Sequence, residues 1–454
     1  MSSHEQFVST KTGCEQYEIF AVLTIAPFAI LLRNLALPWI FLGRRFTYND
    51  WGLGLKFFLD FAVIVLPFML ALSFFAASSL FILLILMLCI LMLLLFVFLE
   101  FTLFMRERPP IKGLLQKIIE EHHHPTTFLT YLRSLVLIFT NIAILAVDFP
   151  VFPRRFAKTS HYGHSVMDVG VAAFIYILAV GRQLKTQGMR DRQEKRGGRF
   201  RRAFASSTAF LIYLGIGRTL LIKGLGYPEV VSEYGLHWNF FYTFFIVQVV
   251  AKFLPKRFHA LLAILFATAH QLLLSSGYEE WALSEDAPRT DFISANREGF
   301  CSLLGYIAMY YFASSIGKFI TSTGCRLRNW IQCCAYLFLL AGFFFVLQKG
   351  AEMAIGAPSR RITNLSYIFA QLSLFTYGLA ICLGVQVVAF IGWAANVPHF
   401  GTDENPWEGV QPCLLDSVNK MGFLFFLIGN VFTDLNRYRN FVSCWRVNGF
   451  GGER

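Results

Sequence analysis

Long runs of apolar residues alternate along this chain with short polar segments. Several of these runs exceed the ~20 residues that an α-helix needs to cross a lipid bilayer. They predict about twelve spans, at residues 18–42, 55–76, 78–105, 128–148, 166–183, 203–222, 239–255, 258–276, 299–320, 330–348, 364–393 and 419–435. We therefore expect an all-α fold, a polytopic transmembrane helical bundle.

The polar segments are short, and the chain shows no internal repeat and no low-complexity stretch. This organisation predicts one transmembrane domain over residues 1–435. Residues 436–454 are too polar to span a bilayer, and we expect them to form a separate tail. The first apolar run is too long for a cleavable signal peptide, so it should remain as the first span.

The composition agrees with a membrane protein, since 56% of the 454 residues are hydrophobic and 50 are Phe. A net charge of +12 would also suit a nucleic-acid-binding protein. The basic residues, however, lie in short loops between spans and form no basic face interleaved with aromatic residues, which argues against nucleic acid. The nine cysteines form no CxxC pair, and the histidine run at 122–124 has the setting of a solvated loop, so we expect no metal site.

The distribution of basic residues predicts how the chain is oriented. Residues 184–202 contain eight Lys or Arg against two acidic residues, and the positive-inside rule places such a loop in the cytosol. This loop follows the fifth predicted span, so loops after odd-numbered spans are cytosolic and the N-terminus lies on the far side. The acidic segment 277–298 falls on that far side, as expected.

The segment 146–159 carries the strongest candidate chemistry. It places one carboxylate, three cations and two prolines between apolar runs; the charged residues are Asp148, Arg154, Arg155 and Lys158. The prolines disfavour helix, which predicts an irregular loop after the fourth span. Charges at membrane depth usually pair or face a cavity. Because these cations lie on the far side, against the positive-inside rule, contact with an anionic ligand explains them better than topology does.

Three further polar blocks fall on the same side of the membrane. Arg218 ends the sixth span, His237 to Asn239 begin the seventh, and Asn296 to Glu298 begin the ninth. The orientation was inferred from basic loops alone, whereas these blocks stand out by their residue types. Their agreement predicts one shared site.

These blocks resemble a known family. The run Ala146 to Thr159 is followed by Tyr162-Gly163 and Met167 to Val171, and then, in order, by Leu214 to Arg218, Glu233 to Phe241 and Ala295 to Gly299. The series is similar to the glucosaminyl-phosphatidylinositol inositol acyltransferases of GPI-anchor biosynthesis. The resemblance is strong from about Asn141 to Tyr311, is hydropathic outside that range, and ends at Asn436. The family has thirteen spans, so the polar tail 436–454 of this chain is divergent.

The resemblance implies an enzyme of the endoplasmic-reticulum membrane with a lumenal N-terminus. It would transfer a fatty acyl group from acyl-CoA, a co-substrate, to the inositol of glucosaminyl-phosphatidylinositol, without a cofactor. The family's proposed catalytic pair is an Asp and a Lys, which correspond to Asp148 and Lys158. A carboxylate suits a base that accepts the hydroxyl proton, and an ammonium suits the oxyanion. Alternatively, Asp148 is a counter-ion that braces the kinked loop.

The substrate-binding candidates are Asn141, Arg154, Arg155, Asp168, Arg218, His237, Asn239, Asn296, Arg297 and Glu298. The two arginines of the loop either hold a phosphate or act as scaffold. Asn141 either orients Asp148 or makes a contact between helices. Asp168 is either a second carboxylate of the cavity or a helix cap.

The later blocks leave alternatives as well. Arg218 either binds phosphate or pairs with Glu233 or Glu298. His237 is an alternative base, although it and its neighbours through Asn239 also suit an anchor at the membrane interface. Arg297 and Glu298 are adjacent, so they should face different ways and pair with other helices.

Two rival functions remain. Many helices with buried charges and Pro or Gly interruptions also occur in non-enzymatic lipid or solute transporters, but we find no matching broken spans in two halves. A structural subunit of a complex would tolerate neutral substitutions in the loop. Residues 163–167 lack the second glycine of a nucleophile elbow, so direct transfer is expected rather than a covalent acyl-enzyme.

Overall fold

The computed structural model describes residues 13–41, 52–104, 127–190, 207–224, 231–254, 257–284, 286–323, 327–396 and 411–433, and the secondary structure of these ranges is helical, with no strand. The expected all-α class is confirmed. The histidine run 122–124, most of the basic loop 184–202 and the polar tail 436–454 lie outside the described residues.

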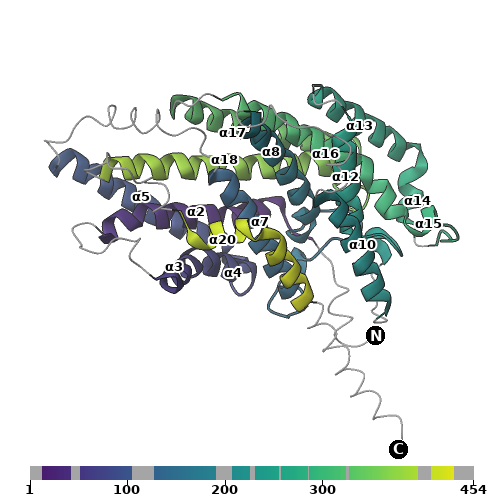
Figure 1. Ribbon diagram of the computed structural model, residues 1–454, viewed down its shortest axis with the longest axis horizontal. Helices are drawn as coiled ribbons and strands as arrows, with labels where there is room; N and C mark the ends of the chain where they lie inside the picture. Colours follow the sequence, from purple (N-terminus) through teal and green to yellow (C-terminus); the bar gives the residue numbers. More distant parts are fainter. Residues whose placement is uncertain are drawn as a thin grey trace, which may run out of the picture.

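The helices follow the apolar runs closely (Figure 1). They are α2 (Gln16–Phe41), α3 (Leu53–Asp60), α4 (Leu66–Leu72), α5 (Ser79–Phe104), α7 (Thr127–Ala146), α8 (Gly170–Arg190), α10 (Ser207–Gly224), α11 (Val231–Tyr234), α12 (Phe240–Phe253), α13 (His259–Leu273), α14 (Glu279–Leu283), α15 (Phe292–Ala295), α16 (Arg297–Thr321), α17 (Leu327–Ala354), α18 (Leu365–Asn396) and α20 (Cys413–Lys420). Single π-helical turns, Phe61–Val65 and Leu274–Tyr278, join α3 to α4 and α13 to α14.

Each of the twelve expected runs coincides with a helix, but fewer helices are long enough to count as spans. Among the described residues, nine helical stretches are long and apolar enough to cross a membrane. The stretches Thr208–Leu220 and Phe240–Phe253 are shorter, and α20 meets the helix Gly422–Thr433 at 86°. This bent pair would make a tenth span. The count of twelve spans therefore stays a prediction.

The bend after α20 has a packing cause. α20 packs against α7 and α3, and it does not run straight into the helix Gly422–Thr433 that follows it. The Ser134 hydroxyl of α7 donates to the Leu415 carbonyl at 2.6 Å, and the Leu414 N–H donates to Asp60 at 3.0 Å. These bonds hold the short helix across its neighbours, which the hydropathy of the last run did not reveal.

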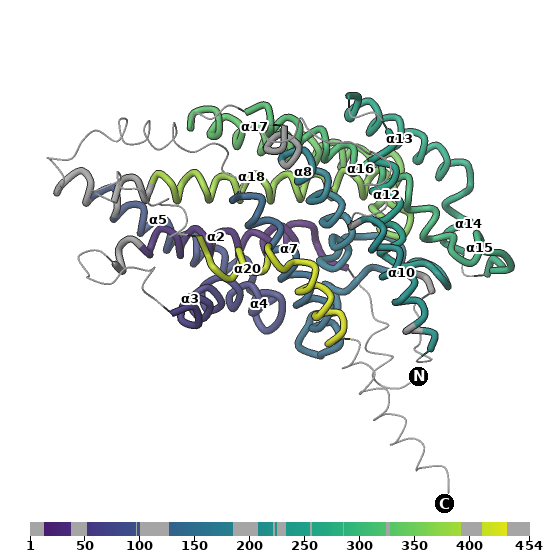
Figure 2. Tube along the Cα trace, in the orientation of Figure 1, coloured from purple at the N-terminus to yellow at the C-terminus, as the bar shows by residue number. Residues whose placement is uncertain are grey.

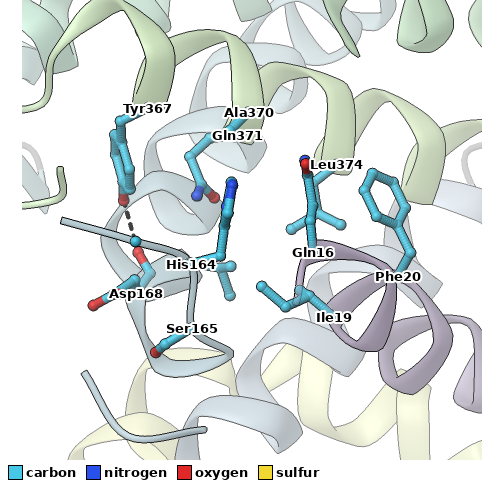
Figure 3. Close-up of a pocket in the computed structure, with 12 residues that line it drawn as sticks. Gln16, Ile19, Phe20, His164, Ser165, Asp168, Tyr367, Ala370, Gln371 and Leu374 are labelled. Atoms are coloured by element: carbon cyan, nitrogen blue, oxygen red, sulfur yellow. Dashed lines mark hydrogen bonds between the residues drawn. The ribbon is translucent and has the colours of Figure 1, made fainter. Parts of the chain in front are cut away.

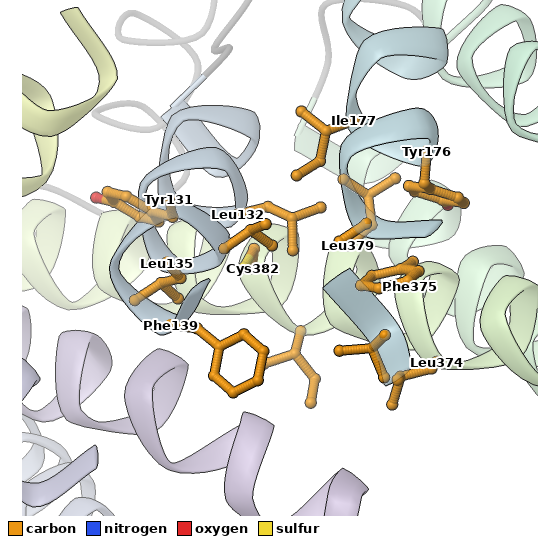
Figure 4. Packing of buried hydrophobic residues seen from close by; sticks show 14 of the residues in the cluster. Tyr131, Leu132, Leu135, Phe139, Tyr176, Ile177, Leu374, Phe375, Leu379 and Cys382 are labelled. Atoms are coloured by element: carbon orange, nitrogen blue, oxygen red, sulfur yellow. The ribbon is translucent and has the colours of Figure 1, made fainter. Parts of the chain in front are cut away.

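The core lies where α7, α8 and α18 meet. Figure 4 shows Leu132 of α7, Tyr176 of α8 and the α18 side chains Phe375 and Leu379 gathered where these helices meet, and all four are buried. α18 also packs along α17 and α2, and α8 packs along α16, as the tube in Figure 2 shows. By contrast, most described side chains of α5 are exposed, and its apolar residues cover the whole circumference, which is typical of a helix that faces lipid.

Helix ends that are distant in sequence meet at one end of the bundle. The Gly163 N–H of the α7–α8 loop donates to the Pro358 carbonyl between α17 and α18 at 2.8 Å. The Leu236 N–H before α12 donates to the Ala295 carbonyl before α16 at 3.0 Å. Alternating helix direction predicts that these ends share one side of the membrane, and the contacts agree with it.

A buried ion pair ties α2 to α3 on the other side of the core. The Arg33 Nε lies 2.8 Å from the Asp60 Oδ1, and both side chains are almost fully buried. Asp60 is the last residue before the π-helical turn, and it also accepts the Leu414 N–H of α20. One carboxylate thus joins three helices. Inside a membrane protein, such a charge requires its partner.

The replacement Arg33→Met should strongly destabilise the protein, because it leaves the Asp60 carboxylate buried and uncompensated. Breaking a buried pair from one side costs about 3–5 kcal/mol. The double variant Arg33→Met/Asp60→Leu should recover most of the loss. Thermal unfolding in detergent checks this, with the exposed Lys318→Gln as control. A single variant as stable as the parent protein would show that the pair contributes nothing.

Candidate active site

The loop 147–166 between α7 and α8 is irregular but firmly held. Pro153 precedes a single 3-10 turn, Arg154–Phe156. The rings of Phe152 and Phe156 are fully buried, with centroids 6.2 Å apart, and they fasten the loop to the core. Gly163 has a φ of 121°, a conformation that favours glycine, where the loop turns toward α8. The predicted proline-containing loop is therefore present after the fourth apolar run.

Asp148 lies half-buried in the turn that follows α7. The neighbouring Arg154 donates from Nη1 to the Val147 carbonyl at 2.7 Å. Burial lowers the pKa of the Arg154 guanidinium, and the negative charge of Asp148 raises it in part. The cation thus lies close enough to stabilise the Asp148 carboxylate.

Arg155 has a different environment. Its Nε lies 2.8 Å from the Glu18 Oε2 at the start of α2, and its guanidinium lies 4.9 Å from the centroid of the Phe156 ring. The side chain therefore connects the loop to α2. This geometry favours the scaffold alternative for Arg155.

Lys158 is held by a carboxylate that comes from α11. Its Nζ donates to both carboxylate oxygens of Glu233, at 2.8 and 2.7 Å. Burial lowers the pKa of the ammonium, while the charges of Glu233 and Asp168 raise it and that of Arg360 lowers it. From the sequence, Glu233 was expected only as a partner for Arg218, and its contact with Lys158 was missed.

Asp168 binds across two loops. Its Oδ2 accepts from the Thr159 N–H at 3.2 Å and from the Thr159 hydroxyl at 2.7 Å, and its Oδ1 lies 2.8 Å from the Arg360 Nε. The Asp168 side chain is 3% exposed and that of Arg360 is 6% exposed. The carboxylate caps no helix, so that alternative was wrong. It joins the motif loop to the loop between α17 and α18.

The same loop contributes Arg361. Its Nη1 lies 3.0 Å from the His161 Nδ1 and 3.4 Å from the Ser160 carbonyl, and its Nη2 lies 3.5 Å from the Glu298 Oε1. Neither Arg360 nor Arg361 was among the expected residues. They follow the tenth apolar run, on the far side, where the positive-inside rule disfavours cations. Like the cations of the motif loop, these two arginines stand out because they oppose the positive-inside rule.

Glu298 lies at the centre of an arginine cluster at the start of α16. Arg289 donates to its two oxygens, at 2.5 and 3.1 Å, and Arg361 approaches from the opposite loop. Arg297 is fully buried and donates to the carbonyls of Ala287 and Ser284. The expectation that Arg297 and Glu298 avoid each other was only partly right, because their charged atoms still lie 3.9 Å apart.

Asn239 and Asn296 build the backbone around the site. Asn239 caps α12 by accepting the Phe241 N–H at 3.0 Å, and it donates to the Gly215 carbonyl of α10 at 2.9 Å. Asn296 is fully buried, and its Oδ1 accepts the His237 N–H at 2.7 Å. The His237 ring is itself exposed and contacts Lys223. In the described contacts these two amides have structural roles.

Two further expected residues take no part in the ion pairs of Lys158, Asp168 and Glu298. The Asn141 Nδ2 donates to the Phe425 carbonyl at 2.9 Å, so it contacts the helix Gly422–Thr433 and does not orient Asp148. Arg218 is exposed and forms no ion pair with Glu233 or Glu298, which pair with Lys158 and with arginines of other elements. The alternative in which Arg218 pairs with one of these carboxylates is not seen, and the phosphate alternative stays a prediction.

A small pocket adjoins the loop where α2 and α18 pass it. Figure 3 shows His164 and Asp168 on one side and Gln16, Gln371 and Leu374 around it. The His164 Nε2 lies 3.3 Å from the Glu352 Oε1. Burial lowers the pKa of the His164 ring, and the negative charge of Glu352 raises it in part. No group of three or more metal-ligating side chains occurs within the ranges that the structure covers.

Comparison of the sequence with those of known proteins agrees with the family resemblance of the motif loop. The sequence model of the GWT1 family matches residues 1–436. The chain is 30% identical over 470 residues to a mouse protein named glucosaminyl-phosphatidylinositol-acyltransferase PIGW, a match that covers 95% of this chain and 90% of the relative.

The similarity extends to the human and fungal proteins. The human protein of the same name is 29% identical over 466 residues, covering 95% of this chain and 90% of the relative. The GPI-anchored wall transfer protein 1 of Gibberella zeae is 31% identical over 475 residues, covering 95% and 89%. Since the family model matches residues 1–436 and relatives of 30% and 31% identity cover 95% of the chain, this chain belongs to the GWT1 family.

Proposed function

We propose that this protein is a membrane O-acyltransferase of GPI-anchor biosynthesis that transfers a fatty acyl group from acyl-CoA to the inositol ring of glucosaminyl-phosphatidylinositol. The observation that carries the proposal is the motif loop of a GWT1-family chain, which holds the Asp148 carboxylate and the Lys158 ammonium outside the membrane-spanning helices. The names of the relatives favour acyl transfer over the transporter alternative.

The reaction needs a base and an oxyanion partner. The inositol hydroxyl attacks the thioester carbonyl while Asp148 accepts its proton. Lys158 stabilises the negative oxygen of the tetrahedral intermediate. The intermediate collapses with cleavage of the C–S bond, and the proton held by Asp148 passes to the departing thiolate. The products are the inositol ester and CoA, and no cofactor is required.

The phosphate of the glycolipid needs a cation that is not already paired with a carboxylate of the protein. Arg155 is bound to Glu18, and the buried arginines near α16 are bound to Glu298 and to carbonyls. Arg218 is exposed, and its charge influences the neighbouring Tyr234, which adjoins Glu233. We therefore assign the phosphate contact to Arg218.

The site lies on the lumenal side of the endoplasmic-reticulum membrane in this proposal. The N-terminus is lumenal and the protein is multi-pass, as the basic loop at 184–202 predicts. Acyl-CoA, glucosaminyl-phosphatidylinositol and membrane lipids are the partners, and nucleic acid is not. Acylation of glucosaminyl-phosphatidylinositol by membranes that contain the full chain, followed by mass spectrometry of the lipid, tests the activity directly.

The variant Asp148→Asn should abolish inositol acylation while folding and membrane insertion stay intact, because an amide cannot accept the hydroxyl proton. Turnover is measured in membranes with both substrates, with the exposed Asp286→Asn as the matched control. Near-parental turnover would remove Asp148 from the mechanism. Loss of detergent-stable protein would instead identify Asp148 as a structural counter-ion.

The variant Lys158→Met should lower kcat by about 10²-fold or more and leave glycolipid binding nearly unchanged. Removing one donor from a developing oxyanion typically costs about 3 kcal/mol of transition-state stabilisation. Separate measurements of kcat and of glycolipid binding distinguish the roles. If binding weakens in step with turnover, Lys158 is a substrate ligand and the oxyanion role is wrong.

A further inference from the structure

The Lys158 ammonium has one hydrogen-bonding partner within the described ranges. It donates to the two oxygens of Glu233 at 2.8 and 2.7 Å and to no other described residue. The Lys158 side chain remains 32% exposed and that of Glu233 22% exposed, unlike the neighbouring pair of Asp168 and Arg360, which is buried. The contact therefore lies at the open edge of the charged cluster, where a substrate can reach it.

The geometry of this contact has a direct chemical consequence. A lysine ammonium carries three N–H donors and rotates freely about its last bond unless its partners prevent it. Two of the donors bind the two oxygens of one carboxylate, which fixes the rotation. The third donor then points in one defined direction, away from Glu233, and it stays available to a substrate oxygen.

Glu233 is itself held in place by the start of α16. It lies in α11, and the next residues turn sharply at Gly235, whose φ is 107°. A side chain at position 235 would place its Cβ 2.5 Å from the Asn296 Cα, so only glycine permits this approach. The buried Asn296 side chain also binds the His237 N–H. The carboxylate thus rests on a backbone that neighbouring elements support.

The charges that face Lys158 come from three elements. Glu233 comes from α11, Asp168 from the start of α8, and Arg360 from the loop between α17 and α18. Arg360 binds Asp168 directly, so Glu233 is the carboxylate left for the ammonium. Since burial lowers the pKa of Lys158 and Glu233 raises it, removal of the Glu233 charge should let the amine lose its proton at a lower pH.

From this arrangement we infer that Glu233 is a positioning residue for acyl transfer, which orients the Lys158 ammonium and keeps it charged so that its free N–H meets the oxyanion. The inference rests on the proposed function. It adds a residue outside the motif loop, supplied by an element 75 positions further along the chain.

The test compares Glu233→Gln and Glu233→Asp in the full-length protein, with the exposed Glu280→Gln as matched control. Glu233→Gln should lower kcat by about 10- to 100-fold, while the KM for glucosaminyl-phosphatidylinositol changes less than about threefold. The alkaline limb of the kcat profile should move to lower pH. Glu233→Asp should restore part of kcat and return the alkaline limb toward its original position.

Two outcomes would overturn the inference. An unchanged kcat and pH profile for Glu233→Gln would show that Lys158 does not depend on it. A raised KM with unchanged kcat and profile would make Glu233 a substrate ligand. The double variant Glu233→Gln/Lys158→Met should be no slower than Lys158→Met alone, and a further loss would show that Glu233 acts independently. Full activity of Lys158→Met would refute the catalytic role of the lysine itself, a result distinct from those above.

Discussion

The structure around the site depends on the need of each buried charge for a partner. At one end of the bundle, the Asp168 carboxylate and the Arg360 guanidinium are almost completely withdrawn from water and lie 2.8 Å apart. Glu298 is fully buried among arginines of two other segments. A charge left alone there would cost several kcal/mol. The loops that carry these residues are therefore obliged to lie together, and the motif loop is fixed in the process.

The charged residues fall into two groups according to their exposure. The buried pairs of Asp168 and Glu298 connect loops and are almost fully withdrawn from water. The pair of Lys158 and Glu233 and the carboxylate of Asp148 remain partly open to water. The buried pairs thus form the frame of the site, and the partly exposed groups on that frame are the ones that a substrate can reach.

The membrane environment sets the rest of the architecture. α5 presents apolar side chains on all sides and is exposed along most of its length, as a lipid-facing helix requires. α16 is buried along most of its length and carries polar residues at its start, where the site lies. On the opposite side of the core, the Arg33 and Asp60 pair secures α2, α3 and α20. Buried ion pairs thus fix helices at both ends of the bundle.

The sequence alone was enough to place the helices and the proline-containing loop, and it predicts the side of the membrane on which the polar blocks gather. Each of these follows from local properties: the length of an apolar run, the backbone restriction at Pro150 and Pro153, and the count of basic residues in a loop. The count of twelve spans stays a prediction, because the stretches Thr208–Leu220 and Phe240–Phe253 are short and α20 packs against α3 and α7 where the last run begins.

Which charge binds which became clear only from the way the helices pack. Lys158 pairs with Glu233, 75 residues away, and Asp168 pairs with Arg360, 192 residues away. Arg218, for which pairing with Glu233 or Glu298 was one alternative, forms an ion pair with neither of them. Several cations and carboxylates on one side of a membrane permit many combinations of similar Coulomb energy. The choice among them depends on how the helices pack, and that packing is a property of the whole chain.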